Sequence, residues 1–208
     1  MSQKDVAATF NPDQLRAEAA IRKAAREGNA EAQFRLGVMF GNGDGVGLDY
    51  EQARNWFEQA AAQGHEGALL TLAWMHANGT GVDVDEDRAR ELYLKAAGLG
   101  SAKAQYVVGT MYRFAQYGVH KDIPTAVQWY LKAADQGMAT AQFALGRMLM
   151  EGKGVMQDDA AALQWLSLAH VNGSKRAEDY VKHLIKRMDP AVVREVRERM
   201  TGQNGSAG

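Results

Sequence analysis

The sequence predicts an all-α protein, a solenoid of four tandem helix-pair repeats with N- and C-terminal capping helices. One observation is a glycine that recurs every 36 or 37 residues. The others are an alanine column of the same period and an aspartate column in the second half of each unit. Self-similarity at such a period is the signature of stacked helical repeats. The columns are Gly28, Gly64, Gly100, Gly137 and Gly173; Ala32, Ala68, Ala104, Ala141 and Ala177; and Asp49, Asp85, Asp122 and Asp158.

Each repeat is predicted to contain two helices joined by a glycine-rich loop. In the first copy, the first helix covers residues 31–41 and the second covers residues 49–63. The aspartate that opens the second helix is expected to cap it, by accepting from the unpaired N–H groups of its first turn. The glycine after that helix suits a left-handed residue at the helix end. Pro124, just inside the second helix of the third copy, fits the position where a helix tolerates proline.

The phase of the repeat sets the boundaries along the chain. Asp13 and Ala17 lie 36 residues before Asp49 and Ala53, so an N-terminal half-unit precedes the first full repeat. After Gly173 the sequence keeps the phase but gains charge, as expected of a terminal cap with a wetter face. The predicted boundaries are a flexible N-terminus at 1–12, a half-unit at 13–28, repeats at 29–64, 65–100, 101–137 and 138–173, a cap at 174–200 and a disordered tail at 201–208.

Three further columns predict how the helices pack. A column of small residues allows two helices to approach closely, so a larger side chain there would overpack the interface. A tryptophan column is expected to supply the large buried side chains. A methionine column at helical spacing indicates core. These columns are Gly37, Ala73, Gly109 and Gly146; Trp56, Leu92, Trp129 and Trp165; and Met39, Met75, Met111 and Met148.

Composition narrows the classes of function. The net charge of −1 argues against broad electrostatic attraction to nucleic acid or anionic membrane. The chain has no cysteine, which excludes disulfides, thiolate metal sites and cysteine nucleophiles. No stretch is long and apolar enough for a signal peptide or a membrane span. The sequence as given therefore predicts a cytoplasmic protein that is a monomer or a weak homo-oligomer.

The motifs with a chemical interpretation are better explained by the repeat. The glycine-rich run 41–47 follows a predicted helix, and it lacks the Lys-Ser/Thr of a phosphate loop and the spaced carboxylates of a calcium loop. The five histidines lie in different repeats, and none has the spacing of a helical metal site. We therefore expect no catalytic residue, no metal and no cofactor.

Residues 13–173 resemble the Sel1-like repeat family, a relative of the tetratricopeptide repeat. The resemblance lies in the runs 102–109, 118–122 and 126–137, where a dozen columns recur in register. It implies a right-handed α/α superhelix whose concave groove binds proteins. It also implies that the shared residues are structural, so that no catalytic residue and no named ligand carries over. Some relatives are secreted and have cysteines in each repeat, which this chain lacks.

The residues that depart from the repeat pattern are the candidate binding residues. Trp74 occupies a variable first-helix column, together with Thr110 and Arg147, where no structural role demands a tryptophan. By family analogy two neighbouring columns also line the groove, and the third-repeat loop adds two aromatic residues where the other copies are polar. Aromatic side chains and arginines are the usual anchors of protein interfaces. The candidates are Arg35, Trp74, Gln105, Thr110, Phe114, Tyr117, Gln142 and Arg147.

These departures favour a non-enzymatic adaptor or scaffold that binds a partner protein or peptide in the groove. A core role for Trp74, filling the space between adjacent helices, remains an alternative. One other function would be a small-molecule or hydrolase site between repeats, and another would be self-assembly through the end caps. The basic residues after 174 are interleaved with acidic ones, so we expect a solvated cap and no nucleic-acid partner.

Overall fold

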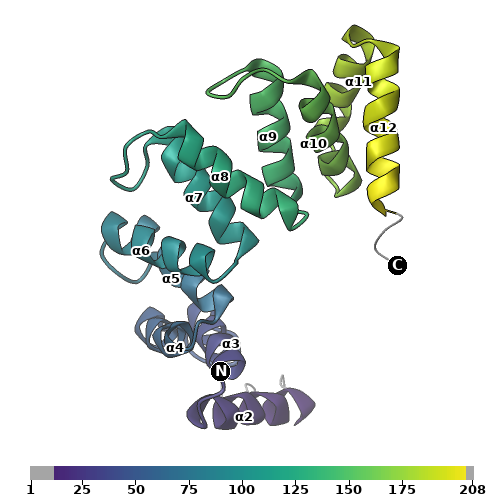
Figure 1. Ribbon diagram of the computed structural model, residues 1–208. Coiled ribbons are helices and arrows are strands. Elements are labelled where there is room, and N and C mark those ends of the chain that lie inside the picture. The colour runs from purple at the N-terminus through teal and green to yellow at the C-terminus, as the bar shows by residue number, and fades with distance from the viewer. Residues whose placement is uncertain (1–11, 205–208) are drawn as a thin grey trace, which may run out of the picture. The chain divides into compact units, whose positions relative to one another are not determined.

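The computed structural model describes residues 12–204, and all regular structure in that range is helical (Figure 1). The predicted all-α class is confirmed. The helices are α2 (Pro12–Arg26), α3 (Ala30–Asn42), α4 (Tyr50–Ala62), α5 (Glu66–Asn78), α6 (Glu86–Gly98), α7 (Ala102–Phe114), α8 (Ile123–Asp135), α9 (Ala139–Glu151), α10 (Asp159–Val171), α11 (Ala177–Arg187) and α12 (Pro190–Asn204).

The helices pack in the predicted pairs within two compact units. The first unit ends at Leu99 and contains the pairs α3–α4 and α5–α6, with α2 packed on α3. The second begins at Gly100 and contains the pairs α7–α8 and α9–α10, with α11 and α12 packed on α10. Within each unit the successive pairs stack on each other, through α4 and α5 in the first unit and through α8 and α9 in the second, as in other repeat proteins (Figure 1).

The predicted residues that cap the second helix of each repeat are confirmed. Asp49 accepts a hydrogen bond from Gln52 N at 2.9 Å, and the equivalent aspartates cap α6, α8 and α10 in the same way. Gly64 follows α4 with a φ of +81°, in the left-handed region where glycine has no Cβ to clash. The glycines at 28, 100, 137 and 173 share this conformation.

The loop between the two helices closes with one hydrogen bond in every repeat. In the third repeat, Asp122 N donates to the carbonyl of Tyr112 at 2.9 Å. The same bond joins Asp49 to Phe40, Asp85 to His76 and Asp158 to Leu149, at 2.9, 2.9 and 3.0 Å. The extra residue of the third repeat is therefore accommodated inside the loop. There Ala115 and Tyr117 adopt left-handed φ values of 55° and 53°.

The core of each pair forms where a small residue of the first helix meets a large residue of the second. A Cβ added to Gly109 would lie 2.8 Å from the Tyr130 ring, and one added to Gly37 would lie 2.6 Å from Phe57. The prediction for the tryptophan column is wrong for its three tryptophans, because Trp56, Trp129 and Trp165 are only half-buried, whereas Leu92 of the same column is buried. The residue after each position in that column points into the pair instead: Phe57, Tyr93, Tyr130 and Leu166.

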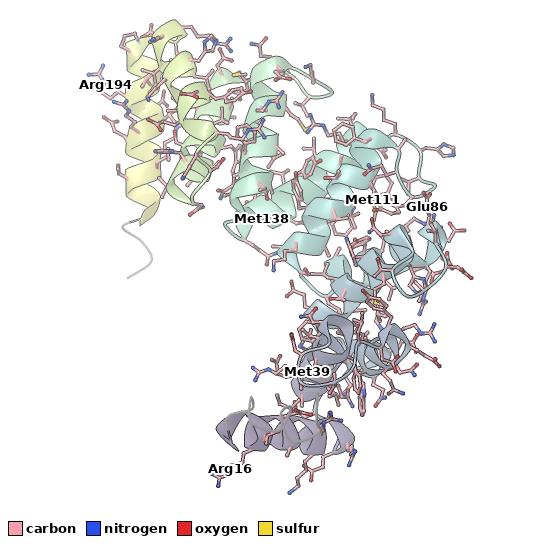
Figure 2. The ribbon with its side chains drawn as sticks, turned by 180° about the vertical axis from the view of Figure 1, so that it is seen from behind. Arg16, Met39, Glu86, Met111, Met138 and Arg194 are labelled. Atoms are coloured by element: carbon pink, nitrogen blue, oxygen red, sulfur yellow. The ribbon has the colours of Figure 1, made fainter. Side chains whose placement is uncertain are left out.

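The methionine column belongs to the core, as predicted, in three of its four positions. Met75, Met111 and Met148 are buried, whereas Met39 in the first copy is half-buried. Figure 2 labels Met39 on α3 and Met111 on α7. Three of the four methionine side chains therefore lie inside the fold, and little of this column is open to a partner.

The ends of the chain differ from the expected boundaries. Helix α12 continues past residue 200 and ends at Asn204, so the first residues of the expected disordered tail are helical. Val193 and Val196 of α12 pack with Leu184 of α11, and this contact holds the helix on the cap. The expected flexible segment at the N-terminus overlaps the described chain only at Pro12, because residues 1–11 and 205–208 lie outside the described range.

Candidate protein-binding surface

A pocket of about 150 Å³ lies between α3, α4 and α5 of the first unit. Its lining includes Val38 from α3, Phe57 from α4, and Thr71 and Trp74 from α5. Trp74 remains 51% exposed, so its indole is not part of the core. The choice between a core and an exposed Trp74 is thus resolved in favour of exposure. We name this feature the Trp74 pocket.

A larger cleft, of about 320 Å³, lies in the second unit. First helices of successive repeats form its walls, α7 on one side and α9 on the other, and the turn before α11 closes it. We name it the arginine cleft after its three basic side chains. The side chains that characterise it are Tyr106, Arg113, Phe114, Phe143, Arg147 and Arg176.

Each arginine of the cleft lies over an aromatic ring. The guanidinium carbon of Arg113 is 5.0 Å from the Phe114 ring centre, and that of Arg176 is 5.6 Å from the Phe143 ring centre. Arg147 lies 5.9 Å from Phe143 and 5.6 Å from Tyr180. Cation–π attraction holds such planar groups in place, and a guanidinium that lies over a ring can still donate through its N–H groups.

Glu151 pairs with Arg147 beside the cleft. The Arg147 Nη2 lies 2.7 Å from Glu151 Oε1, and Lys153 Nζ lies 2.7 Å from Oε2. The hydrogen bonds from Lys153 and then Arg147 hold the pKa of the Glu151 carboxyl below its ordinary value. The hydrogen bond to Glu151 in turn raises the pKa of Arg147. Arg147 is thus the one cleft arginine that already has a carboxylate partner within residues 12–204.

The floor of the cleft rests on a buried tyrosine. Tyr130 is 1% exposed, and its ring lies 5.5 Å from that of Tyr106. Its hydroxyl lies 3.1 Å from Oγ1 of Thr110, which donates to the carbonyl of Tyr106 at 2.9 Å. Burial raises the pKa of Tyr130, so the phenol stays neutral at physiological pH. Thr110, a predicted binding residue, thus supports the floor from a half-buried position.

Two predicted binding residues lie inside the fold. Gln105 and Gln142 are 6% and 3% exposed, and both form hydrogen bonds between helices. Gln136 donates to Gln105 Oε1 at 2.8 Å, while Gln142 donates to the carbonyl of Ala134 at 3.0 Å. Their amides form these bonds inside the fold because a buried amide needs partners.

The other predicted residues are divided between the two units. Phe114 and Arg147 come together in the arginine cleft, and Trp74 lines its own pocket. Arg35 is exposed on α3 and donates to Glu31 at 2.6 Å. Tyr117 is half-buried in the loop after α7 and lines neither hollow.

Sequence reasoning missed part of the arginine cleft. Arg113, Arg176, Tyr106 and Phe143 were not among the candidates. The sequence did contain a signal for Tyr106 and Phe143. A column of large apolar or aromatic residues recurs at 36- or 37-residue spacing: Phe34, Leu70, Tyr106 and Phe143. Nothing comparable marks the two arginines, because Arg113 lies in the third repeat and Arg176 lies in the cap.

One histidine has a defined structural role. His65 caps α5 by accepting from Ala68 N at 3.2 Å, and its ring stacks on Phe34 at 4.6 Å. Within residues 12–204, no group of three His, Cys, Asp or Glu side chains is placed to hold a metal ion. No helix in that range is both long enough and apolar enough to cross a membrane.

The helix pairs and their capping define a helical-repeat protein. The Sel1 repeat model matches four segments, at residues 30–65, 68–101, 102–138 and 139–169. The chain therefore belongs to the Sel1 repeat family. Repeats of this family commonly form protein-interaction scaffolds, and the fold is typically non-catalytic.

Solved structures agree with this assignment. A Sel1 repeat protein from Oxalobacter formigenes is 38% identical with a TM-score of 0.76, and the match covers 81% of this chain and 48% of that one. The c5321 protective antigen of uropathogenic Escherichia coli is 30% identical with a TM-score of 0.75, covering 88% and 40%. This chain thus spans less than half the length of either.

More distant structures share the fold alone. The immunity protein PA5088 of Pseudomonas aeruginosa is 20% identical with a TM-score of 0.55, and the match covers 93% of this chain and 73% of that one. The comparison with curated proteins gave no match.

Proposed function

We propose that this chain is a non-enzymatic scaffold that binds a partner protein through the first helices of its repeats. The observation that carries the proposal is Trp74, a half-exposed tryptophan beside an apolar pocket. Leaving an indole in water forgoes the stabilisation that burial would give, so a partner that covers Trp74 gains it on binding. Tryptophan is also among the residues enriched at the energetic centres of interfaces.

The surroundings of Trp74 suit a side chain from a partner. Val38 and Thr71 line the same pocket with small apolar groups, and the Phe57 ring reaches it from α4. Such a pocket accepts an aliphatic or aromatic side chain, and the indole forms part of its lining. A buried anchor of this kind is how a small area contributes most of an interface's affinity.

The test compares Trp74→Ala with Met156→Ala. Met156 is 88% exposed in a loop of the second unit, so its variant controls for loss of an exposed apolar side chain. Wild type and both variants serve as baits for co-purification from the native cell. A partner identified with wild type is then purified, and its affinity is measured by isothermal titration calorimetry.

We expect Trp74→Ala to weaken that partner's binding by about tenfold or more, with little change from Met156→Ala. The melting temperature should fall only slightly, because Trp74 is half-exposed. Unchanged affinity of a folded Trp74→Ala protein would show that this surface is not the interface.

A further inference from the structure

We infer that the arginine cleft binds an acidic segment of a partner protein, in which Asp or Glu side chains alternate with apolar ones. The inference rests on the proposed function in treating the chain as a protein-binding scaffold. It concerns a different surface, however, since the Trp74 pocket lies in the first unit and the arginine cleft in the second.

The cleft is positively charged. Its lining contains Arg113, Arg147 and Arg176 and no acidic side chain. Arg147 is paired with Glu151, but Arg113 and Arg176 form no ion pair with a carboxylate of residues 12–204. Two guanidinium groups in one cleft without counter-charges favour an anionic ligand, because carboxylates are their preferred bidentate acceptors.

The charge distribution along the chain reinforces this preference. Residues 100–208 carry 14 Lys and Arg against 10 Asp and Glu, whereas residues 1–99 carry 10 against 15. The balanced net charge of the whole chain therefore conceals an excess of positive charge in the unit that contains the cleft. Such an excess raises the local concentration and the association rate of an acidic segment.

The aromatic side chains of the cleft add a preference for apolar residues in the bound segment. Phe114 is 59% exposed, and Tyr106 and Phe143 contribute half-buried rings from α7 and α9. The rings also orient the guanidinium planes above them, so less conformational entropy is lost when a carboxylate binds. A segment that alternates acidic and apolar residues can place its carboxylates on the arginines and its apolar side chains on the rings.

The surroundings of the cleft disfavour a nucleic acid. Binding of a phosphate backbone needs basic side chains in succession along its path. Here Glu151 is paired with Arg147, and Glu178 and Asp179 follow Arg176 by only a few residues on α11. These carboxylates interrupt the basic surface, and they would repel a long polyanion that extended beyond the cleft.

The experiment measures binding of a short fluorescein-labelled peptide in which Glu and Asp alternate with Leu and Phe. The matched peptide has Gln and Asn in place of the acids. Fluorescence anisotropy gives the Kd for the wild-type protein at low salt and at about 0.3 M NaCl. The variants are Arg113→Gln/Arg176→Gln in the cleft and Lys23→Gln/Arg26→Gln as a control, which removes the same charge from exposed positions of α2.

We expect the acidic peptide to bind, the neutral peptide to bind at least about tenfold more weakly, and added salt to weaken the acidic complex. The cleft variant should lose about tenfold or more in affinity, and the control should stay within about twofold. Arg113→Lys/Arg176→Lys, which keeps the charge, should fall between wild type and the glutamine variant because lysine is not bidentate. Circular dichroism confirms that each variant is folded.

Several results would overturn the inference: equal binding of the two peptides, equal loss in the control variant, or tighter binding of single-stranded RNA than of the acidic peptide. Self-association of the free protein that the cleft variant abolishes would identify a second copy as the occupant instead. The proposed function is tested separately, since Trp74→Ala should bind the acidic peptide as wild type does. A partner lost with Trp74→Ala but kept by the cleft variant would leave the scaffold proposal standing and reject the acidic ligand.

Discussion

Gln136 donates its side-chain amide to Oε1 of Gln105 at 2.8 Å, and so links the end of α8 to α7. The same amide also reaches the carbonyl of Gly100 at 3.0 Å. Gln63 and Gln33 form the equivalent 2.8 Å bond in the first repeat. One amide pair therefore joins the two helices of a repeat at the same point, and it satisfies a buried acceptor there.

The second repeat indicates which residues can replace that amide pair. Leu69 and Leu99 occupy both positions there, so the two residues differ from the other repeats together. Gln136→Leu alone leaves the buried oxygen of Gln105 without this donor, and we expect it to cost about 1–3 kcal/mol of unfolding free energy. Gln105→Leu/Gln136→Leu should recover part of that loss. Urea denaturation of the single and double variants measures the coupling, and strictly additive effects would contradict it.

Replacing each of two adjacent large residues in α8 should show which of them belongs to the core. Tyr130 is fully buried against Gly109, whereas Trp129 is half-buried with Lys132 Nζ 4.1 Å from its ring centre. Tyr130→Ala should cost about 3–5 kcal/mol, and Trp129→Ala clearly less. If Tyr130→Ala does not fold, Tyr130→Phe gives a milder test and should cost about 1 kcal/mol through the lost contact with Thr110. Thermal unfolding ranks the variants, and a larger loss for Trp129→Ala would reverse the assignment.

The Glu151 carboxylate should make stability depend on pH. Lys153 and Arg147 hold its pKa below the ordinary value in the folded state. Its stabilising contribution is therefore complete above the unfolded pKa of about 4.3, and it is lost as the pH falls through the lower folded pKa. The melting temperature of Glu151→Gln should lie below that of wild type at neutral pH, and the gap should close in acid. A gap that is constant with pH would exclude this linkage.

Replacing the left-handed alanine of the third-repeat loop with glycine should stabilise the protein. Ala115 has a φ of 55° at the position where α3, α5 and α9 end in Gly43, Gly79 and Gly152. A left-handed residue with a Cβ costs about 1–2 kcal/mol, part of which is offset because glycine has more freedom in the unfolded chain. Ala115→Gly should therefore stabilise the protein by about 0.5–1 kcal/mol. Gly43→Ala is the matched reverse change and should lower the denaturation midpoint.

Periodicity predicted those features that depend on one position within a repeat. The aspartate caps and the left-handed glycines were predicted correctly because each serves the helix to which it belongs. Periodicity does not give the rotation of a helix about its axis, and one residue turns the side chain by about 100°. The sequence therefore favoured Trp129 over Tyr130 as the buried residue.

The candidate site was harder to predict because it brings together different repeats. Arg113 and Arg176 lie on elements far apart in sequence, and they line one cleft only because α7, α9 and the start of α11 are neighbours in the fold. Gln105 and Gln142 were chosen by analogy of position, but burial assigns their amides to the interior. Phe114 and Arg147 were found because each breaks its column, which is a signal that a single sequence can carry.

The loop-closing bond between Asp122 and Tyr112 also has a practical consequence. It has the same length as the bonds between Asp49 and Phe40 and between Asp85 and His76, although its loop is one residue longer. Connections that tolerate added length without disturbing the helices on either side are natural insertion points for protein engineering. A recognition peptide or a reporter group grafted between Ala115 and Gly118 should be displayed while the flanking pair stays intact.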